Sequence, residues 1–421
     1  MGQASGIEKK LILAPQAAKG TCAVGNLATA QYLRRINSSM NVTKETYQSN
    51  EMRSDRQIAD FRHGVQAVEG SLSGELSPGT YNLLMAAILR KAWAAGEVSG
   101  PESDITVAIV SGASATFTSA ATATFLTDGL KVGDVVRWTG FAQTGTDARA
   151  NNAHNFMITA LTEKIMTGTF LDGVAAVEKA ETEALTCTVV GKKCWTPTTG
   201  HTEDWFSIEH NYSDVDLSEV FWDCKVNTMA VKLPPTGIST IDFGFVGLNH
   251  TNYAGATAPY FTAVLAASTG GALAAVNGAL FVQGTKIALL TGLDFDIAGN
   301  LSSDPVVGSN VKTDIFDGRV IIKGNMSVYF EDATFRDYFI NETEVSICGA
   351  FTTSNAANAD FLAFTMPRVK VGGASKDDGE KGIIQTMPFV ALFDTSAGPD
   401  TGATATDSLA TTLSIQDSTL T

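Results

Sequence analysis

The densest group of potential metal ligands in the sequence lies between residues 201 and 210. It comprises His201, Glu203, Asp204, Glu209 and His210. Imidazole and carboxylate groups bind zinc, but the spacing of these residues matches no established zinc motif, and the two cysteines shortly before them do not complete one. We therefore predict a polar loop that leads into a strand, with no metal and no cofactor. A hydrolase that uses Glu203, Asp204 and Glu209 is the enzymatic interpretation of the same residues.

No other motif in the sequence indicates catalysis. The chain contains no G-x-S-x-G nucleophile elbow, no H-E-x-x-H pair and no phosphate-binding loop that ends in Lys-Ser or Lys-Thr. The remaining histidines, His63, His154 and His250, stand far apart in the sequence. We predict that the protein is not an enzyme.

The most distinctive polar segment runs from residue 50 to residue 62 and alternates acids with arginines. Its charged residues are Glu51, Arg53, Asp55, Arg56, Asp60 and Arg62. Arginine and carboxylate groups pair with defined geometry, so this segment is a candidate docking loop between subunits or rings. The alternative is an ordinary solvated loop.

Composition and charge argue against several other classes of protein. The net charge is −15 and the basic residues are dispersed, so we expect no nucleic-acid-binding surface. No apolar run is long enough to cross a membrane, and we expect no export signal. Five cysteines, an odd number spread over 421 residues, indicate a reducing compartment. The acidic excess serves either solubility or a channel that repels DNA.

The sequence resembles itself at fixed offsets. At an offset of 254, residues 61–64 match residues 315–318, and a preceding strand around Met40 recurs 255 residues later. At an offset of 145, residues 224–233 and 237–245 resemble later segments that begin at Pro367 and Gly382. Because 254 minus 145 is 109, we predict a duplication in which the first copy carries an insertion of roughly a hundred residues.

The local patterns predict mostly strands. Alternation of apolar and polar residues favours strands over 32–46 and 61–76, separated by a loop. Helices are predicted over 81–95 and 332–340. The insertion alternates strands with glycine turns, which favours a small barrel or sandwich. Its predicted strands cover 106–110, 115–125, 132–138, 156–161 and 184–190.

The predicted fold is mainly β, with two tandem β-sandwich or barrel domains, each with a flanking helix, and an inserted all-β domain. Residues 1–100 and 200–250 form the first domain, 101–199 the insertion and 251–395 the second domain. Residues 396–421 are rich in small polar residues and are predicted to form a flexible arm that orders only against a partner. In the second copy, the loop equivalent to the docking loop carries Asp304, Asn310, Lys312 and Asp314.

Several stretches resemble the major tail tube protein family of siphophages, the long-tailed bacteriophages. They are residues 11–15, 43–47, 49–64, 75–79, 195–201, 331–334 and 376–382. The resemblance implies a structural virion protein whose β-sandwich-like domains form rings that stack into a hollow tail. It also implies that a long loop after the first strand contacts the neighbouring ring, and residues 49–60 occupy that place in the sequence.

The resemblance further implies how the chains associate. Simple members of the family place six single-domain subunits in each ring, so two tube domains per chain imply a trimer with pseudo-sixfold symmetry, and a hexamer is the alternative. The expected partners are the chain itself and the tape measure, tail terminator and distal tail proteins. DNA would pass through the lumen without specific binding, and no membrane would be involved. The expected location is the virion tail, after assembly in the host bacterial cytoplasm.

A competing hypothesis from the residues is a carbohydrate-binding or adhesin-like virion protein. Small β modules bind sugars through exposed aromatic rings. The candidates for such rings are Trp138, Trp195, Trp205 and Trp222.

Overall fold

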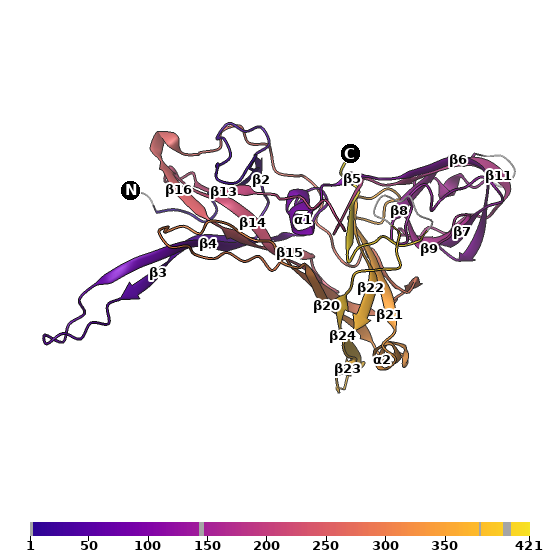
Figure 1. Cartoon of the computed structure of the whole chain (residues 1–421). Coiled ribbons are helices and arrows are strands. Elements are labelled where there is room, and N and C mark those ends of the chain that lie inside the picture. Colours follow the sequence, from indigo (N-terminus) through magenta and orange to yellow (C-terminus); the bar gives the residue numbers. More distant parts are fainter. Residues whose placement is uncertain (1–2, 143–146, 379, 399–405) are drawn as a thin grey trace.

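One long sheet of eight strand positions organises the chain (Figure 1). The computed structural model describes residues 3–142, 147–378, 380–398 and 406–421, and within them the chain is mainly β, as predicted. The strands of the long sheet are, in spatial order, β3 (Asn37–Gln48), β4 (Phe61–Glu75), β15 (Thr240–Gly247), β14 (Leu217–Leu233), β19 (Leu290–Ala298), β20 (Ile321–Tyr329), β24 (Ile384–Ala391), and β22 (Phe361–Val371) continued by β23 (Ser375–Lys376).

The long sheet consists of two sets of four strands, which pair in the same register. We call β3, β4, β15 and β14 the first quartet, and β19, β20, β24 and β22 with β23 the second quartet. In the first quartet Met40 lies opposite Gly70. Shifts of 255 and 254 convert this pair into Phe295 and Gly324, which lie opposite each other between β19 and β20. A Cβ atom on Gly70 would collide with the Ser39 backbone, and one on Gly324 with the Asp294 backbone, so both positions require glycine.

The remaining pairings of the quartets agree as well. In the first quartet Glu75 lies opposite Thr240. Adding 254 to the first residue number and 144 to the second gives Tyr329 and Ile384, which also lie opposite each other. The register between β14 and β15 shifts by one residue after Val226. In the second quartet, the register shifts by one residue between the β22–β24 pairing and the β23–β24 pairing. The shift from β15 to β24 is therefore 144. For β15, the offset of 145 predicted from the sequence was therefore wrong by one residue. An error of one residue would place every side chain of the strand on the opposite face of the sheet.

A second group of strands covers each quartet. Over the first quartet lie β2 (Gln31–Tyr32), β1 (Lys9–Pro15), β13 (Phe206–Tyr212) and β16 (Asn249–Ala254), joined by the first half of β14. Over the second quartet lie β18 (Thr285–Lys286), β17 (Gly278–Val282), β21 (Glu344–Thr352), β25 (Ser414–Asp417), β12 (Lys192–Trp195) and β5 (Ala94–Ala95), joined by the first half of β22.

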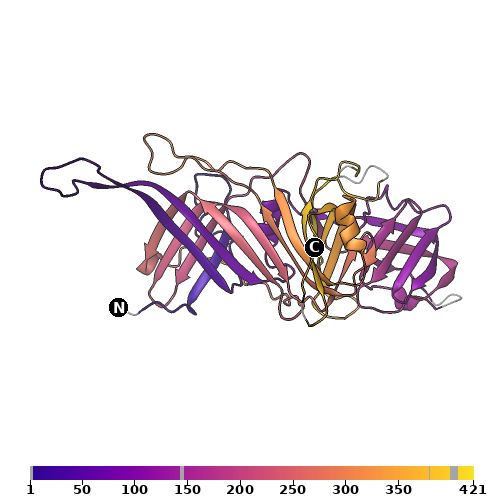
Figure 2. The same cartoon turned by 90° about the horizontal axis from the view of Figure 1, so that it is seen from below.

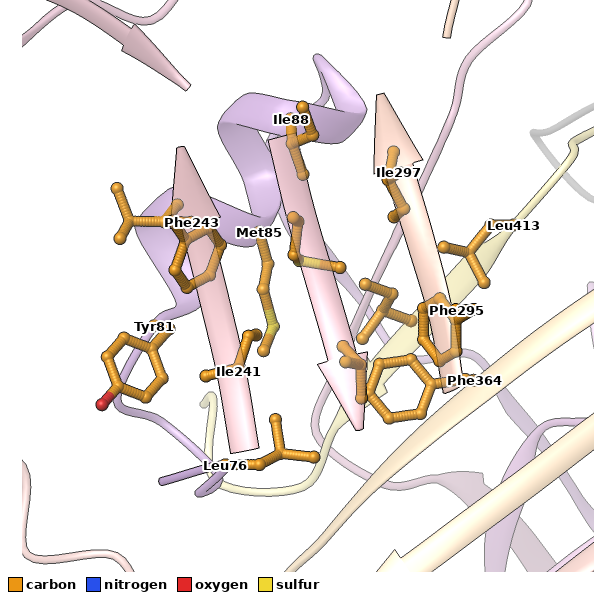
Figure 3. Close-up of a cluster of buried hydrophobic side chains, with 14 of the residues drawn as sticks. Leu76, Tyr81, Met85, Ile88, Ile241, Phe243, Phe295, Ile297, Phe364 and Leu413 are labelled. Carbon is orange, nitrogen blue, oxygen red and sulfur yellow. The ribbon is translucent and has the colours of Figure 1, made fainter. Parts of the chain in front are cut away.

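The hydrophobic core is continuous across the two quartets (Figure 3). The helix α1 (Asn82–Leu89) lies across β15, β14 and β19, and its Met85 and Ile88 belong to the same cluster as Phe243 from the first quartet and Ile297 from the second. Edge pairing of β14 with β19 joins the quartets, with residues 228–233 opposite 293–298. The two halves therefore share one core as well as one sheet.

The helices are shorter than the sequence predicted. Helix α1 ends at Leu89, not near Ala95, because Arg90 adopts a left-handed conformation with φ of 57° and closes the helix through backbone hydrogen bonds to the last turn. The second helix, α2 (Thr334–Ile340), starts two residues later than expected. The described residues also contain two short 3-10 turns, η1 (Arg149–Asn151) and η2 (Gly255–Thr257).

Six strands between β5 and β12 close into a small barrel (Figures 1 and 2). They are β6 (Val98–Ser111), β7 (Ser114–Ser119), β8 (Val135–Thr139), β9 (Phe156–Leu161), β10 (Ile165–Phe170) and β11 (Lys179–Val189). Stacking of Phe117 on Trp138, with ring centroids 4.3 Å apart, fills the interior. Of these strands, β10 was not predicted from the sequence.

The described end of the chain is part of the fold. Residues Ser414–Asp417 form β25, a buried strand between β12 and β22. The expectation of a flexible arm over 396–421 therefore does not hold for this segment; residues 399–405 lie outside the described part. The physical reason is that the open edges of β12 and β22 provide backbone partners for a strand, which a composition rich in small polar residues does not reveal.

Candidate assembly surfaces

The hairpin of β3 and β4 extends beyond the body of the molecule as an arm (Figures 1 and 2). The two strands pair from Asn37 and Ser73 out to Gln48 and Phe61. Beyond the last pair, residues 50–60 are all exposed. The arm therefore carries the predicted docking loop at its tip, away from the body of the described chain.

The charged residues of the docking loop pair with each other. Arg53 forms an ion pair with Asp55 at 2.9 Å, and Arg62 one with Asp60 at 2.6 Å. The hydrogen bonds from the two arginines hold the pKa values of Asp55 and Asp60 below their usual range. The remaining charges, Glu51 and Arg56, make no ion pair within the described residues.

Apolar side chains accompany these charges at the tip. Met52 is fully exposed and Ile58 is 66% exposed. Exposed charged and apolar groups on one loop are typical of a surface that becomes buried in a complex.

The equivalent loop of the second quartet lies elsewhere and does not project. Asp304 and Asn310 are exposed, Lys312 and Asp314 are half-buried, and Asp314 pairs with Lys19 at 2.7 Å. Burial alone would raise the pKa of Asp314, but the Lys19 ammonium and a backbone hydrogen bond hold it below its usual range.

This second loop folds back over the first quartet. The backbone N–H of Gln66 donates to the carbonyl of Asn310 at 2.9 Å, and Ile315 is buried against Trp205 and Leu248. The structure therefore does not bring the two predicted loops together at one site. Nothing in the sequence distinguished the loop that projects from the one that folds back.

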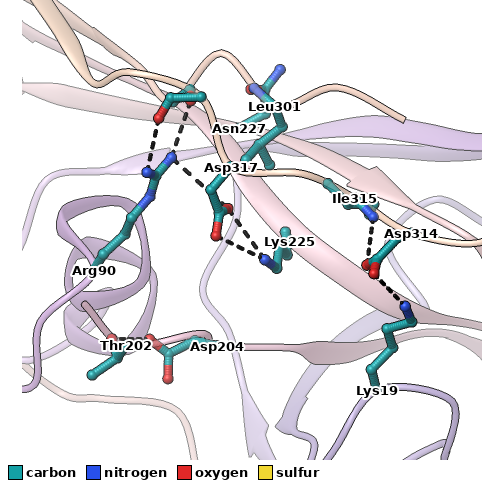
Figure 4. A network of polar contacts seen from close by, with 12 residues as sticks. Lys19, Arg90, Thr202, Asp204, Lys225, Asn227, Leu301, Asp314, Ile315 and Asp317 are labelled. Carbon is teal, nitrogen blue, oxygen red and sulfur yellow. Dashed lines mark hydrogen bonds and ion pairs between the residues drawn. The ribbon is translucent and has the colours of Figure 1, made fainter. Parts of the chain in front are cut away.

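Three side chains of the first quartet and its helix clamp the second loop in place (Figure 4). Arg90 donates to the carbonyls of Gly318 and Gly299 at 2.8 and 3.1 Å. Lys225 donates to both carboxylate oxygens of Asp317 at 3.1 and 3.2 Å, and the Asn227 amide oxygen accepts the N–H of Leu301 at 2.9 Å. We call this set the interloop clamp. It fixes the start of the second quartet to the first.

Replacing Asp317 by alanine should lower the free energy of unfolding by about 1–3 kcal/mol, because the Lys225 ammonium, on a side chain only 7% exposed, loses both hydrogen bonds. The matched control is Asp304→Ala, since this exposed carboxylate lies on the same loop and makes no ion pair within the described residues. That variant should unfold like the parent chain. Urea denaturation measures both, and equal losses would contradict the clamp.

The face of the long sheet opposite the core is mostly polar, and the second loop covers the part of it near Val246, which packs against Ile315 and Trp205. Period-2 alternation places Met40, Phe243 and Phe295 in the core and their sequence neighbours on this outer face. Its charged side chains are Glu69, Glu75, Asp242, Asp294 and Asp296, with Lys232, Lys323 and Lys370. Carboxylates outnumber ammonium groups on this surface.

A family model described as phage tail tube protein matches residues 6–391, which is nearly the whole chain. The chain belongs to this family. A search among curated proteins found no significant match. The tail tube assignment makes the protein a structural component of the virion tail, as predicted from the sequence, in a family that is non-enzymatic in general.

Two of the potential metal ligands of this tail tube protein, Glu209 and His210, are buried and have other partners. Glu209 is buried and accepts the backbone N–H groups of Tyr260 and Phe261 at 2.8 and 3.0 Å. The neighbouring His210 contacts Ser38 at 2.8 Å, and burial lowers its pKa to about 3. No three His, Cys, Asp or Glu side chains gather into a potential metal site in the described parts of the chain.

Three of the four candidate tryptophans of the tail tube protein are buried. Trp138 is fully buried, Trp195 and Trp205 are each 6% exposed, and Trp222 is half-buried. Trp138 and Trp205 belong to buried clusters, so these rings do not offer the exposed faces that the carbohydrate-binding hypothesis requires, and for Trp222 that hypothesis stays untested. Among the helices that the structure describes, none has the length and apolar character of a membrane span.

Proposed function

We propose that this tail tube protein assembles into rings that stack into the hollow tail tube, through which phage DNA is ejected. The observation that carries the proposal is the joint between β14 and β19, where two quartets of equal register meet edge to edge and continue as one sheet. A sheet built from equivalent units extends by repeating the same joint. A closed ring of such units leaves no free strand edge.

The duplication favours three chains in each ring. One chain supplies two quartets, or eight strand positions, so three chains of eight supply 24 positions with pseudo-sixfold symmetry. A ring of six chains is the alternative. Each quartet with its covering strands and helix then acts as one tube domain.

In this proposal the polar outer face of the long sheet lines the lumen. Its carboxylates, among them Asp294 and Asp296, repel the DNA phosphates, so DNA slides without sticking. The opposite face is buried in the core and cannot line a channel.

The barrel then lies on the outside of the tube. Its Val135 and Met157 pack against Phe281 and Phe361, which belong to the strands that cover the second quartet on the side away from the lumen face. In this position the extra volume does not obstruct the channel.

The arm provides the contact between rings, through Glu51, Arg53, Asp55, Arg56, Asp60 and Arg62 at its tip. The ends of the tube would contact the tape measure, tail terminator and distal tail proteins. All five cysteines are free thiols, which suits assembly in the reducing cytoplasm of the host bacterium.

Negative-stain electron microscopy of the purified protein tests this proposal. We expect hollow rings and tubes that increase with protein concentration, and rotational averaging of end-on rings should show threefold modulation of a sixfold outline. Rings with strict sixfold symmetry would exclude the trimer. Monomers at every concentration would contradict the tube function.

A further inference from the structure

Two strand edges of the long sheet have no strand partner in the described part of the chain. One is the outer edge of β3, which pairs only with β4. The free part of this edge begins at Ser39, because the Ser38 carbonyl already accepts a hydrogen bond from Lys9 Nζ at 2.8 Å. The other is the outer edge of residues 373–378, where β23 pairs only with β24. These edges lie at opposite ends of the long sheet.

Each of these free edges has a counterpart in the other quartet, and within the chain the two counterparts pair with each other. The register shifts relate β3 to β19 by 255 and residues 373–378 to the end of β14 by 145. In the chain, β14 and β19 pair antiparallel with Ala230 opposite Asp296. Applying the two shifts to this pair gives Ser375 and Asn41. Each open edge is thus the counterpart of an edge that has a known partner in a known register.

We propose that β3 of one chain pairs antiparallel with residues 373–378 of the next chain, in the register that places Asn41 opposite Ser375. The inference rests on the proposed ring assembly and specifies its lateral joint. In the same register Ser39 lies opposite Asp377 and Thr43 lies opposite Gly373. The partner at both edges is a second copy of this chain.

The side chains indicate that the joint between chains is weaker than the joint within the chain. At the inner joint the core-facing pairs are apolar, with Met229, Val231 and Leu233 opposite Ile297, Phe295 and Leu293. At the proposed joint the pair Val42 with Ala374 is apolar, but Met40 faces Lys376. A less apolar joint gains less from burial, so chains stay separate until assembly adds further contacts.

The charges at the second edge also limit incorrect pairing. Lys376, Asp377 and Asp378 follow one another along the open edge and are all exposed. Charged side chains on an edge strand oppose pairing with unrelated strands, because a generic partner leaves them buried without a counter-charge. Asp377 would face only the small hydroxyl of Ser39 in the proposed register.

Four double-cysteine variants of the full chain test the register. Asn41→Cys with Ser375→Cys, and Ser39→Cys with Asp377→Cys, are the matched pairs. Asn41→Cys with Asp377→Cys, and Ser39→Cys with Ser375→Cys, contain the same substitutions but lie two residues out of register. Directly opposite Cβ atoms are about 4.5–5.5 Å apart and diagonal ones about 7–8 Å, so mild oxidation separates the two sets.

We expect matched pairs to form covalently linked rings on non-reducing gels with several-fold higher yield than mismatched pairs. Higher yield from the mismatched pairs, or no cross-link from any pair in protein that forms tubes, would overturn the register while leaving the tube function intact. Failure of the unmodified chain to assemble would contradict both. If only the cysteine variants fail to assemble, hydrogen exchange on the unmodified chain decides. The proposal requires the amides in residues 39–43 and 373–377 that point to the open edges to become protected on assembly, whereas amides such as that of Asp377 already donate within the chain.

Discussion

A chain that ends at Thr412 is expected not to fold. The truncation removes β25, whose Ile415 is fully buried and whose backbone pairs with β12 on one side and β22 on the other. It also removes Gln416, whose amide oxygen accepts the Val135 N–H and whose amide nitrogen donates to the Val135 and Val190 carbonyls, all at 2.7–2.8 Å. Circular dichroism and solubility of the truncated protein measure the loss.

Point variants separate this role from a general effect of truncation. Ile415→Ala should lower the free energy of unfolding by about 2–5 kcal/mol, since it leaves a cavity in a packed strand. Deleting only Leu420 and Thr421, which lie beyond the last strand and are not buried, should leave stability nearly unchanged. A folded, soluble chain that ends at Thr412 would show that β25 is an accessory strand.

Reversing the charges of Arg53 and Arg56 is expected to give a folded subunit that no longer forms tubes. Both residues lie at the exposed tip of the arm, where Arg53 pairs with Asp55 and Arg56 makes no ion pair within the described residues. Exposed ion pairs of this kind add little to stability. Two glutamates would, however, place like charges against any surface that accepts the arginines. Thermal unfolding and electron microscopy measure the two effects.

The barrel provides a matched control for this prediction. Arg149 is 55% exposed and pairs with Asp147 at 2.8 Å, whereas Arg53 is 48% exposed and pairs with Asp55 at 2.9 Å. Arg149→Glu should therefore leave tube formation unchanged, while Arg53→Glu alone should weaken it. Normal tubes from the Arg53 and Arg56 double variant would remove the docking assignment, and equal defects at Arg53 and Arg149 would indicate a nonspecific effect of charge.

Much of the long sheet could be predicted because its information is local. Alternation along residues 61–76 marks a strand that is observed as β4, and the glycines at 70 and 324 recur because an opposing backbone excludes a side chain at both places. The offsets of 254 and 255 relate strands that occupy equivalent positions in the sheet.

Other features depend on contacts that no local pattern records. The strand β25 is assigned by its partners β12 and β22, which are distant in sequence, and its own residues are few and mostly polar. The end of α1 depends on the left-handed conformation of Arg90, whose guanidinium binds the Gly299 and Gly318 carbonyls more than two hundred residues away. The position of the arm tip is likewise set by how far β3 and β4 continue to pair beyond the core.

The two ends of the barrel meet where it leaves the rest of the chain. Gly96 N–H donates to the Gly191 carbonyl at 3.1 Å, and Ala95 lies opposite Lys192. For β5 and β12, the whole barrel therefore takes the place of a hairpin turn. Any inserted domain whose two ends lie close together, and which still covers Phe281 and Phe361, could replace the barrel between β5 and β12. In the proposed tube, one insertion event could therefore exchange the domain on the exterior without changing the diameter of the channel.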